Sequence, residues 1–270
     1  MRRLKEVFPA GHAGNALQMV IHHDRKVIAG GGVLSGQHHV AELCRVGGDA
    51  AMCGVVEKEV DVHALILDFE NELWKSDFKY ICGIDEVGRG CLAGPVYAGA
   101  SILKNTTDFN SEIFLEINDS KKISEKKREK LYDYINEIAT NSVGICTVEE
   151  IDEIGIQDAV KLSMLRAIEN LEITPDYLLI DSMKLEINIP QRSIVRGDQK
   201  SKSISSASII AKVARDKLMK YEYAKKYPNY NFEKNKGYGT KKHIEAINEF
   251  GITRIHRKTF EPIKSMIGNE

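Results

Sequence analysis

The sequence predicts an α/β fold in which a mixed central sheet is flanked by helices. From residue 79 onward, short apolar runs typical of buried strands alternate with longer amphipathic runs typical of helices. The first two apolar runs follow one another closely, as the strands of a hairpin do, whereas later strands alternate with helices. This order favours three layers around one mixed sheet, followed by a helical C-terminal part.

The first part of the chain differs from the rest. Residues 1–64 are rich in glycine and other small residues and show poor periodicity, so we expect a flexible N-terminal extension of unassigned role. Residues 65–270 are expected to form the main domain, including a lead-in helix that the pattern places over residues 60–76. The apolar positions of this helix recur near helical spacing: Val62, Leu65, Phe69 and Leu73.

Each later element has a local signal. Strands are predicted at residues 80–85, 94–103, 142–148 and 175–181. Helices are predicted within residues 118–138, 156–171, 204–227 and 240–251. Ser124 before Glu125 is a cap signal for the first of these helices, and Gly251 closes the last. The helix at 156–171 is expected to pack through Ala159, Leu162, Leu165, Ile168 and Leu171.

Composition excludes several classes of protein. Hydrophobic residues make up 43% of the 270 residues and charged residues 29%, which is neither a disordered nor a fibrous composition. No segment approaches the roughly 18 apolar residues of a membrane span, so we expect no membrane partner. Five cysteines without a repeating spacing do not form a disulfide framework, and a reducing, cytoplasmic setting fits best.

The net charge of −1 conceals an asymmetry along the chain. Between Arg192 and Lys264 there are 18 Lys and Arg residues against 7 Asp and Glu residues, a balance of +11. The remainder carries 20 basic and 32 acidic residues, a balance of −12. A basic block on a nearly neutral protein is typical of a polyanion-binding surface. The alternative is a solvated helical face with internal salt bridges.

Acidic residues follow two apolar strands at the point where each strand ends. Asp85 and Glu86 come directly after residues 80–84, and Asp181 follows residues 177–180. Asp198 lies just before the long predicted helix. Functional groups of α/β sheets gather at strand ends, so these carboxylates are expected to converge and to need a cation. Because only oxygen ligands are offered, the ion is Mg²⁺ or Mn²⁺, and phosphodiester chemistry is indicated.

The glycines after these acids do not form a dinucleotide-binding motif. Gly88, Gly90 and Gly94 have the wrong spacing, and a strand follows where a helix should begin. This excludes a nucleotide-binding oxidoreductase. Glycines do allow a backbone to come close to a ligand, although a tight turn would explain the same residues.

Five segments, in this order and spacing, closely resemble those of bacterial ribonuclease HII: GIDEVGRGCLAGPV, NDSKKIS, DYLLIDSM, GDQKSKSISSASIIAKVARD and NKGYGTKKH. The resemblance runs from about residue 70 to the end and does not include residues 1–64. It implies a ribonuclease-H-like fold. It also implies Mn²⁺- or Mg²⁺-dependent endonucleolytic cleavage of the RNA strand of RNA–DNA hybrids and of single ribonucleotides embedded in duplex DNA, with 3′-hydroxyl and 5′-phosphate products.

The same resemblance implies roles for individual residues. The catalytic and metal-binding carboxylates are Asp85, Glu86, Asp181 and Asp198. The segment Gly88-Arg89-Gly90, called the GRG loop below, matches the loop that reads the 2′-hydroxyl at the scissile ribonucleotide. Tyr238 matches the tyrosine that stacks on the sugar of the following deoxynucleotide. Expected phosphate contacts are Lys121, Lys122, Lys200 and Ser203.

Two other functions remain open on the residues alone. A nuclease or resolvase that cleaves DNA would use the same carboxylates, although the GRG loop argues against it. A non-catalytic nucleic-acid-binding module would need the basic block but has no use for four carboxylates. We expect a monomer whose partner is RNA–DNA hybrid duplex or ribonucleotide-containing DNA.

Overall fold

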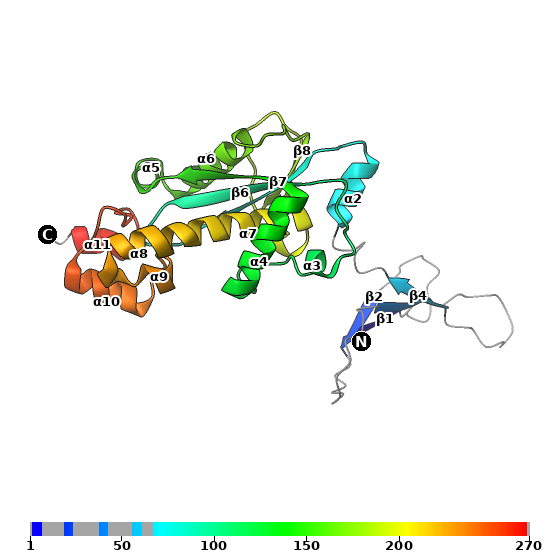
Figure 1. Cartoon of the computed structure of the whole chain (residues 1–270), viewed down its shortest axis with the longest axis horizontal. Coiled ribbons are helices and arrows are strands. Elements are labelled where there is room, and N and C mark those ends of the chain that lie inside the picture. Colours follow the sequence, from blue (N-terminus) through cyan, green and yellow to red (C-terminus); the bar gives the residue numbers. More distant parts are fainter. Residues whose placement is uncertain (1, 7–18, 24–37, 43–55, 61–66, 269–270) are drawn as a thin grey trace, which may run out of the picture. The chain divides into compact units, whose positions relative to one another are not determined.

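The computed structural model describes residues 2–6, 19–23, 38–42, 56–60 and 67–268 (Figure 1). The chain divides into two compact units, Met1–Ile66 and Leu67–Glu270. In the first unit four strands form a sheet in the order β2-β1-β3-β4. Their bounds are Arg2–Glu6 (β1), Met19–His23 (β2), His38–Glu42 (β3) and Val56–Val60 (β4). The prediction of a flexible extension concerns mainly ranges outside the described residues and stays a prediction.

A mixed sheet of five strands lies at the centre of the second unit. Its order is β7-β6-β5-β8-β9. The strands are β5 (Ile81–Val87), β6 (Val96–Leu103), β7 (Ala139–Cys146), β8 (Tyr177–Asp181) and β9 (Gln191–Ile194). β5 pairs antiparallel with β6, and β6 with β7, whereas β5–β8 and β8–β9 are parallel. The predicted mixed sheet with an opening hairpin is therefore confirmed, and β9 is an additional strand.

Helices cover both faces of this sheet (Figure 1). α6 (Ile156–Glu169) packs on one face with the cluster that includes Cys82, Ile84 and Ile180. α7 (Lys202–Lys217) lies against β5 and β6 on the other face, and α4 (Glu125–Ile138) packs on α7. The predicted three-layer arrangement of helix, sheet and helix is therefore confirmed.

Two glycines let α7 come unusually close to the sheet. A Cβ on Gly83 would lie 2.0 Å from the backbone carbon of Ser203, and a Cβ on Gly99 would lie 2.2 Å from the carbonyl oxygen of Ala207. Both gaps are far below van der Waals contact, so a side chain at either position would push the helix away. The N-terminal end of α7 therefore lies directly over β5, the strand that carries Asp85.

The predicted helix ends are mostly confirmed. Ser124 caps α4 by accepting a hydrogen bond from the Lys127 N–H at 3.4 Å. Thr240 caps α10 (Lys241–Phe250), and Gly251 with a φ of 77° ends it. The lead-in helix was predicted to begin too early: α2 spans Asp68–Lys75, and Val60 belongs to strand β4. Val62 and Leu65 lie outside the described residues.

The predicted apolar face of α6 was partly wrong. The fully buried positions include Val160, Met164 and Ala167, whereas Leu162 and Leu165 are only partly buried. The reason is the close approach of α6 to β7, where a Cβ on Gly144 would lie 2.0 Å from the Ser163 carbonyl oxygen. Such an approach favours small residues on the contacting face and moves the leucines to its edges.

The C-terminal part is helical, as predicted (Figure 1). α7 continues through the π-helical segment η2 (Leu218–Tyr223) into α8 (Ala224–Lys226). The remaining helical elements are α3 (Glu112–Leu115), α5 (Val148–Ile154), η1 (Gly197–Gln199), η3 (Pro228–Tyr230), α9 (Phe232–Asn235) and α11 (Ile263–Ile267). The C-terminal helices share a small apolar core around Phe232, Ile247 and Ile263. Within the described ranges no helix has the length and apolar character needed to cross a membrane.

Candidate active site

The strand register brings Asp85 and Asp181 together. β5 and β8 are parallel, and Ile84 pairs with Ile180, so the next residue of each strand is an aspartate beside the other. Side chains alternate between the faces of a sheet, so Asp85 shares the face of Gly83, which contacts α7. Asp181 likewise shares the face of Leu179, which packs with Ile204 of α7. Both carboxylates therefore lie on the face covered by α7.

Asp85 is buried and carries little compensating positive charge. Only 3% of the residue is exposed, and its Oδ1 accepts a hydrogen bond from the Glu86 N–H at 2.8 Å. Burial, followed by the negative charge of Glu86, raises the pKa of Asp85 to about 8. Burial also raises the pKa of Glu86, against the opposing effect of Arg89, whose Nη1 lies 3.7 Å from Oε1 of Glu86. A cation bound here would relieve both effects.

Asp181 connects β8 to the turn that carries Asp198. Its Oδ1 accepts hydrogen bonds from the Gly197 N–H at 2.7 Å and from the Ser182 hydroxyl at 3.2 Å. Gly197 begins η1, so Asp198 is held next to Asp181. Burial raises the pKa of Asp198, and the negative charges of Asp119 and Asp181 raise it further. The four predicted carboxylates thus belong to one electrostatically coupled group.

Asp119 is an additional acid that sequence reasoning did not single out. It is 5% exposed, and it accepts hydrogen bonds from the Lys121 N–H at 2.9 Å and from Nε2 of Gln199 at 3.4 Å. Nζ of Lys122 lies 3.7 Å from its Oδ2. Asp119 therefore closes the turn that places both predicted phosphate-binding lysines beside the carboxylates. The turn-forming residues around it, Asn and Ser, were the available signal.

The oxygen donors suit a hard divalent ion, but they do not form a closed cage. Within the described ranges, no three His, Cys, Asp or Glu side chains lie close enough, as they stand, to hold a metal ion. The donor set around Asp85 and Asp181 consists of carboxylates, and the chemistry of these groups fits Mg²⁺ or Mn²⁺. The buried, uncompensated carboxyl of Asp85 is the feature that a cation would stabilise.

The GRG loop and the Tyr238 loop lie against each other. Gly88 has a φ of 89°, in the left-handed region that favours glycine, and Gly90 is exposed. The Leu92 N–H donates to the Gly237 carbonyl at 2.9 Å, and a Cβ on Gly237 would lie 2.3 Å from the Ala93 carbonyl oxygen. The two loops predicted to contact neighbouring nucleotides are thus one packed unit.

Tyr238 and two predicted phosphate contacts differ in their exposure. Tyr238 is 37% exposed, and burial of part of its ring raises its pKa to about 12. Lys200 follows η1 and is exposed. Ser203 is only 1% exposed, because its N–H donates to Oε1 of buried Glu70 at 2.9 Å. Ser203 therefore faces α2 rather than solvent, and this placement does not support its predicted phosphate contact.

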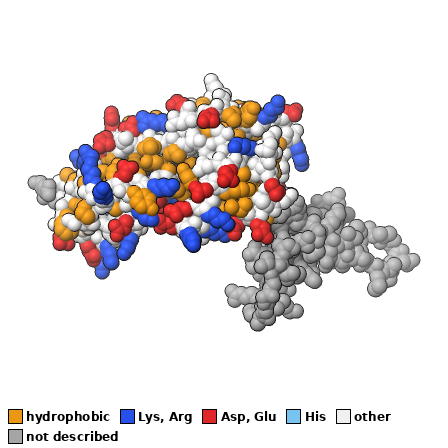
Figure 2. Space-filling model, viewed as in Figure 1, with side chains coloured by type: hydrophobic (Ala, Val, Ile, Leu, Met, Phe, Trp, Pro, Cys, Tyr) orange, Lys and Arg blue, Asp and Glu red, His pale blue; other side chains and the backbone are white. Residues whose placement is uncertain are grey.

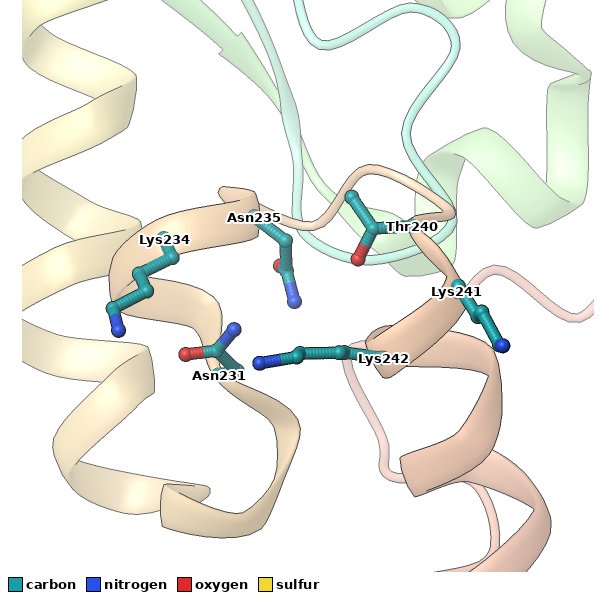
Figure 3. Close-up of a pocket in the computed structure, with 6 residues that line it drawn as sticks. All are labelled: Asn231, Lys234, Asn235, Thr240, Lys241 and Lys242. Carbon is teal, nitrogen blue, oxygen red and sulfur yellow. The ribbon is translucent and has the colours of Figure 1, made fainter.

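A basic pocket opens beside the Tyr238 loop (Figure 3). Its volume is about 310 Å³, and its lining consists of Asn231, Lys234, Asn235, Thr240, Lys241 and Lys242. In Figure 3 Lys242 extends toward Asn231, whereas Lys241 points away from the other side chains. The wider surface is mixed, since Figure 2 shows basic side chains interspersed with acidic ones. Three lysines of the C-terminal basic block are therefore concentrated around the pocket beside Tyr238.

Comparison with known proteins agrees with this geometry. The family model for ribonuclease HII matches residues 82–263. A ribonuclease HII of Bacillus cytotoxicus is 55% identical over 204 residues, which cover 75% of this chain and 76% of that protein. The crystal structure of the ribonuclease H2 from Pyrococcus horikoshii matches with a TM-score of 0.59 and 25% identity, covering 70% of this chain and 97% of that one. A Bst-RNase HIII in complex with Mn²⁺ has the same fold, with a TM-score of 0.52, 15% identity and 70% coverage of both chains.

Proposed function

This chain belongs to the ribonuclease HII family, and we propose that the carboxylates around Asp85 and Asp181 perform its endonucleolytic cleavage of RNA in RNA–DNA hybrids. The enzyme is a hydrolase of phosphodiester bonds and depends on divalent metal ions, as its family does. The observation that supports the assignment of the site is the parallel β5–β8 register, which puts buried Asp85 of β5 beside partly buried Asp181 at the end of β8.

The carboxylates have distinct tasks in this proposal. Asp85 and Asp181 are the inner ligands, because they are adjacent and Asp181 is held rigid by the Gly197 N–H. Glu86 and Asp198 complete the acidic group from either side. A bound Mg²⁺ or Mn²⁺ would supply the positive charge that stabilises the attacking water and the leaving oxygen of an in-line displacement. The protein supplies the fixed arrangement of ligands.

The side chains and loops around the carboxylates position the substrate. Lys121 and Lys122, held by the Asp119 turn, and exposed Lys200 are placed to neutralise backbone phosphates. The GRG loop contacts the 2′-hydroxyl, the group by which a protein distinguishes RNA from DNA. Tyr238 stacks on the neighbouring sugar. This arrangement favours single ribonucleotides in duplex DNA as a further substrate.

One assay tests the proposed function. A duplex with a single ribonucleotide is incubated with and without Mg²⁺ or Mn²⁺, beside an all-DNA duplex of the same sequence, and the products are mapped to the base. We expect cleavage only at the ribonucleotide and only with an ion present. Cleavage of the all-DNA duplex would favour a DNA nuclease instead, and metal-independent binding without product would favour a binding module.

A further inference from the structure

Two arginines are fully buried behind the GRG loop. Arg215 on α7 and Arg257 after α10 are each 0% exposed. Among residues 67–268 neither forms an ion pair with a carboxylate; the ion pairs there involve other cations, such as Arg128 with Asp216. A buried guanidinium is unfavourable unless its N–H groups are satisfied. Backbone carbonyls satisfy both of these arginines, and those carbonyls belong to the loops that face the substrate.

Arg257 holds the GRG loop from behind. Its Nη2 donates to the Gly88 carbonyl at 2.7 Å, and its Nη1 donates to the Arg89 carbonyl at 2.9 Å. Its Nε and Nη2 also donate to the Gly94 carbonyl at 3.0 and 2.8 Å. The backbone N–H of Arg257 donates to the Leu92 carbonyl at 2.9 Å. One residue therefore holds the backbone of the GRG loop and of the segment that follows it, as far as Gly94.

This anchoring determines where the loop's own donors point. In a trans peptide the C=O and the following N–H point in opposite directions. Because the Gly88 and Arg89 carbonyls point inward to Arg257, the N–H groups of Arg89 and Gly90 point outward. Among the hydrogen bonds of residues 67–268 neither N–H donates to another group. A Cβ on Gly90 would meet no atom within 4 Å, so the outer side of the loop is open.

We propose that Arg257 is a positioning residue, which presents the N–H groups of Arg89 and Gly90 to the oxygen of the ribonucleotide 2′-hydroxyl. A hydroxyl oxygen has two acceptor lone pairs and can take both hydrogen bonds. The inference rests on the proposed function, since its ligand is the hydroxyl of that substrate. It goes further by naming the buried residue, distant in sequence, that orients the loop.

Arginine suits this position for a geometric reason. Its planar guanidinium offers five N–H donors in a fixed fork, whereas lysine offers three on a flexible stem. Burial lowers the pKa of Arg257 to about 10, so the side chain still carries its charge and all its donors at neutral pH. Lysine at this position could satisfy one or two of the three carbonyls, and the released peptide groups could rotate.

Arg215 provides a matched control. It is as deeply buried as Arg257, and its Nε, Nη1 and Nη2 donate to the carbonyls of Pro95, Lys236 and Ala93 at 2.9, 2.8 and 3.0 Å. It makes no hydrogen bond to the Gly88 or Arg89 carbonyl. Arg215→Lys therefore disturbs the same region and the same kind of bond without releasing the two peptide groups.

The kinetic test compares Arg257→Lys with the wild type on two duplexes of one sequence. We expect kcat/KM on the single-ribonucleotide duplex to fall about 10- to 100-fold, the size of two lost neutral hydrogen bonds. The Kd for the all-DNA duplex should change less than about 2-fold, because no 2′-hydroxyl is present there. Equal losses on both duplexes would mean a general structural role for Arg257 and would overturn the proposal.

A second measurement begins with the wild type alone and is then repeated in the two variants. The amide resonances of Arg89 and Gly90 in the wild type are followed by NMR during titration with each duplex, without divalent ions. They should shift with the ribonucleotide duplex and not with the all-DNA duplex; this difference should persist in Arg215→Lys and disappear in Arg257→Lys. Unchanged amides in the wild type would overturn the proposal. Absent cleavage with shifted amides would instead contradict the proposed function alone.

Discussion

Asp85 combines a proposed catalytic role with an unfavourable environment. Asp85→Asn keeps the shape of the side chain and removes one ligand charge. Since metal-ion stabilisation of the transition state is worth several kcal/mol, the cleavage rate in saturating Mg²⁺ should fall by roughly 10³-fold or more. Retention of a tenth of the wild-type rate would remove Asp85 from the ligand set. Asp158→Asn, at an exposed carboxylate paired with Lys161, is the control and should cleave normally.

Although Asp85→Asn should lower the cleavage rate, it should raise the stability of the metal-free protein. The pKa of Asp85 is raised in the folded state, so its contribution to stability is present at low pH and is lost as pH rises towards about 8. Asp85→Asn removes this loss, and urea unfolding in EDTA at neutral pH should therefore show a more stable variant. A less stable variant would mean that Asp85 is compensated by a group other than a bound ion.

We propose that Tyr238 distinguishes the two sides of a ribonucleotide. It is partly exposed, and its loop is packed on the GRG loop. Aromatic stacking on nucleic acid is worth about 1–3 kcal/mol, so Tyr238→Ala should slow single-turnover cleavage at an isolated ribonucleotide roughly 5- to 150-fold. The loss should be smaller on a continuous hybrid, where the next sugar carries a 2′-hydroxyl. Tyr238→Phe keeps the ring and should retain most activity. Equal losses on both substrates would leave Tyr238 as a general contact.

At the scale of elements, α2 is fixed to the N-terminus of α7 through Glu70. This side chain is fully buried, and its Oε1 accepts hydrogen bonds from the Ser201 hydroxyl at 2.6 Å and from the Ser203 N–H at 2.9 Å. Its Oε2 has no hydrogen-bond partner, and burial raises its pKa. Glu70→Ala leaves two buried donors unsatisfied and should lower the free energy of unfolding by roughly 2–4 kcal/mol. Glu70→Gln keeps the acceptor and should lower it by less than about 1 kcal/mol. Equal effects in denaturant titrations would show that the carboxylate itself, which both variants remove, rather than the acceptor that Gln keeps, determines the loss.

The C-terminal helices contain a pH-sensitive histidine pair. His243 and His256 are fully buried with their Nε2 atoms 3.1 Å apart, and the Thr253 N–H donates to Nδ1 of His256 at 2.8 Å. Nδ1 of His243 lies 2.9 Å from the Tyr238 carbonyl and donates to it. This chain of hydrogen bonds requires both rings to be neutral. Burial and then His243 lower the pKa of His256 to about 4.

Because the folded pKa of His256 lies below its unfolded value near 6.5, its contribution to stability is present above pH 6.5 and is lost as pH falls towards 4. The loss should reach about 3 kcal/mol. His256→Gln can accept from Thr253 and donate to His243, so its unfolding free energy should depend less on pH over this interval. Parallel urea titrations at pH 7 and pH 4.5 measure the difference. Identical pH slopes for the two proteins would contradict it.

The elements differ in how well local sequence predicts them. β5 and β8 were predictable because each contains an apolar run followed by an acid. The predicted end of β5 was too early, because the strand continues past Asp85 to Val87 and stays paired with β6. β9 was missed because it is short, and two of its four residues are exposed. Asp119 was missed because its partners, Gln199 and Asp198, lie far away in the sequence. The roles of buried Arg257 and Glu70 depend on contacts across the fold, which no local pattern encodes.

For the whole molecule, the unit Leu67–Glu270 contains every residue assigned to the site together with all of the described hydrophobic clusters. This unit is well packed from its first residues onward. Leu67 is 5% exposed and packs with Phe114 and Ile209, while Leu73 and Glu70 of α2 are buried against the sheet and α7. Function and stability should therefore reside in this unit, and α2 should be an obligatory part of it.

Two shortened chains test this division. A chain beginning at Val62 keeps all of these contacts, so its midpoint of thermal unfolding and its kcat/KM on a single-ribonucleotide duplex should match those of the full chain. A chain beginning at Phe78 lacks Leu67, Glu70 and Leu73. Removing two buried leucines costs several kcal/mol, since each large-to-small core change costs about 2–5 kcal/mol, and this is a large fraction of a typical domain's stability. It should be unstable or insoluble. If the chain beginning at Val62 is also inactive or insoluble while the full chain is not, residues 1–61 belong to the catalytic unit, and the two-part description of the protein is wrong.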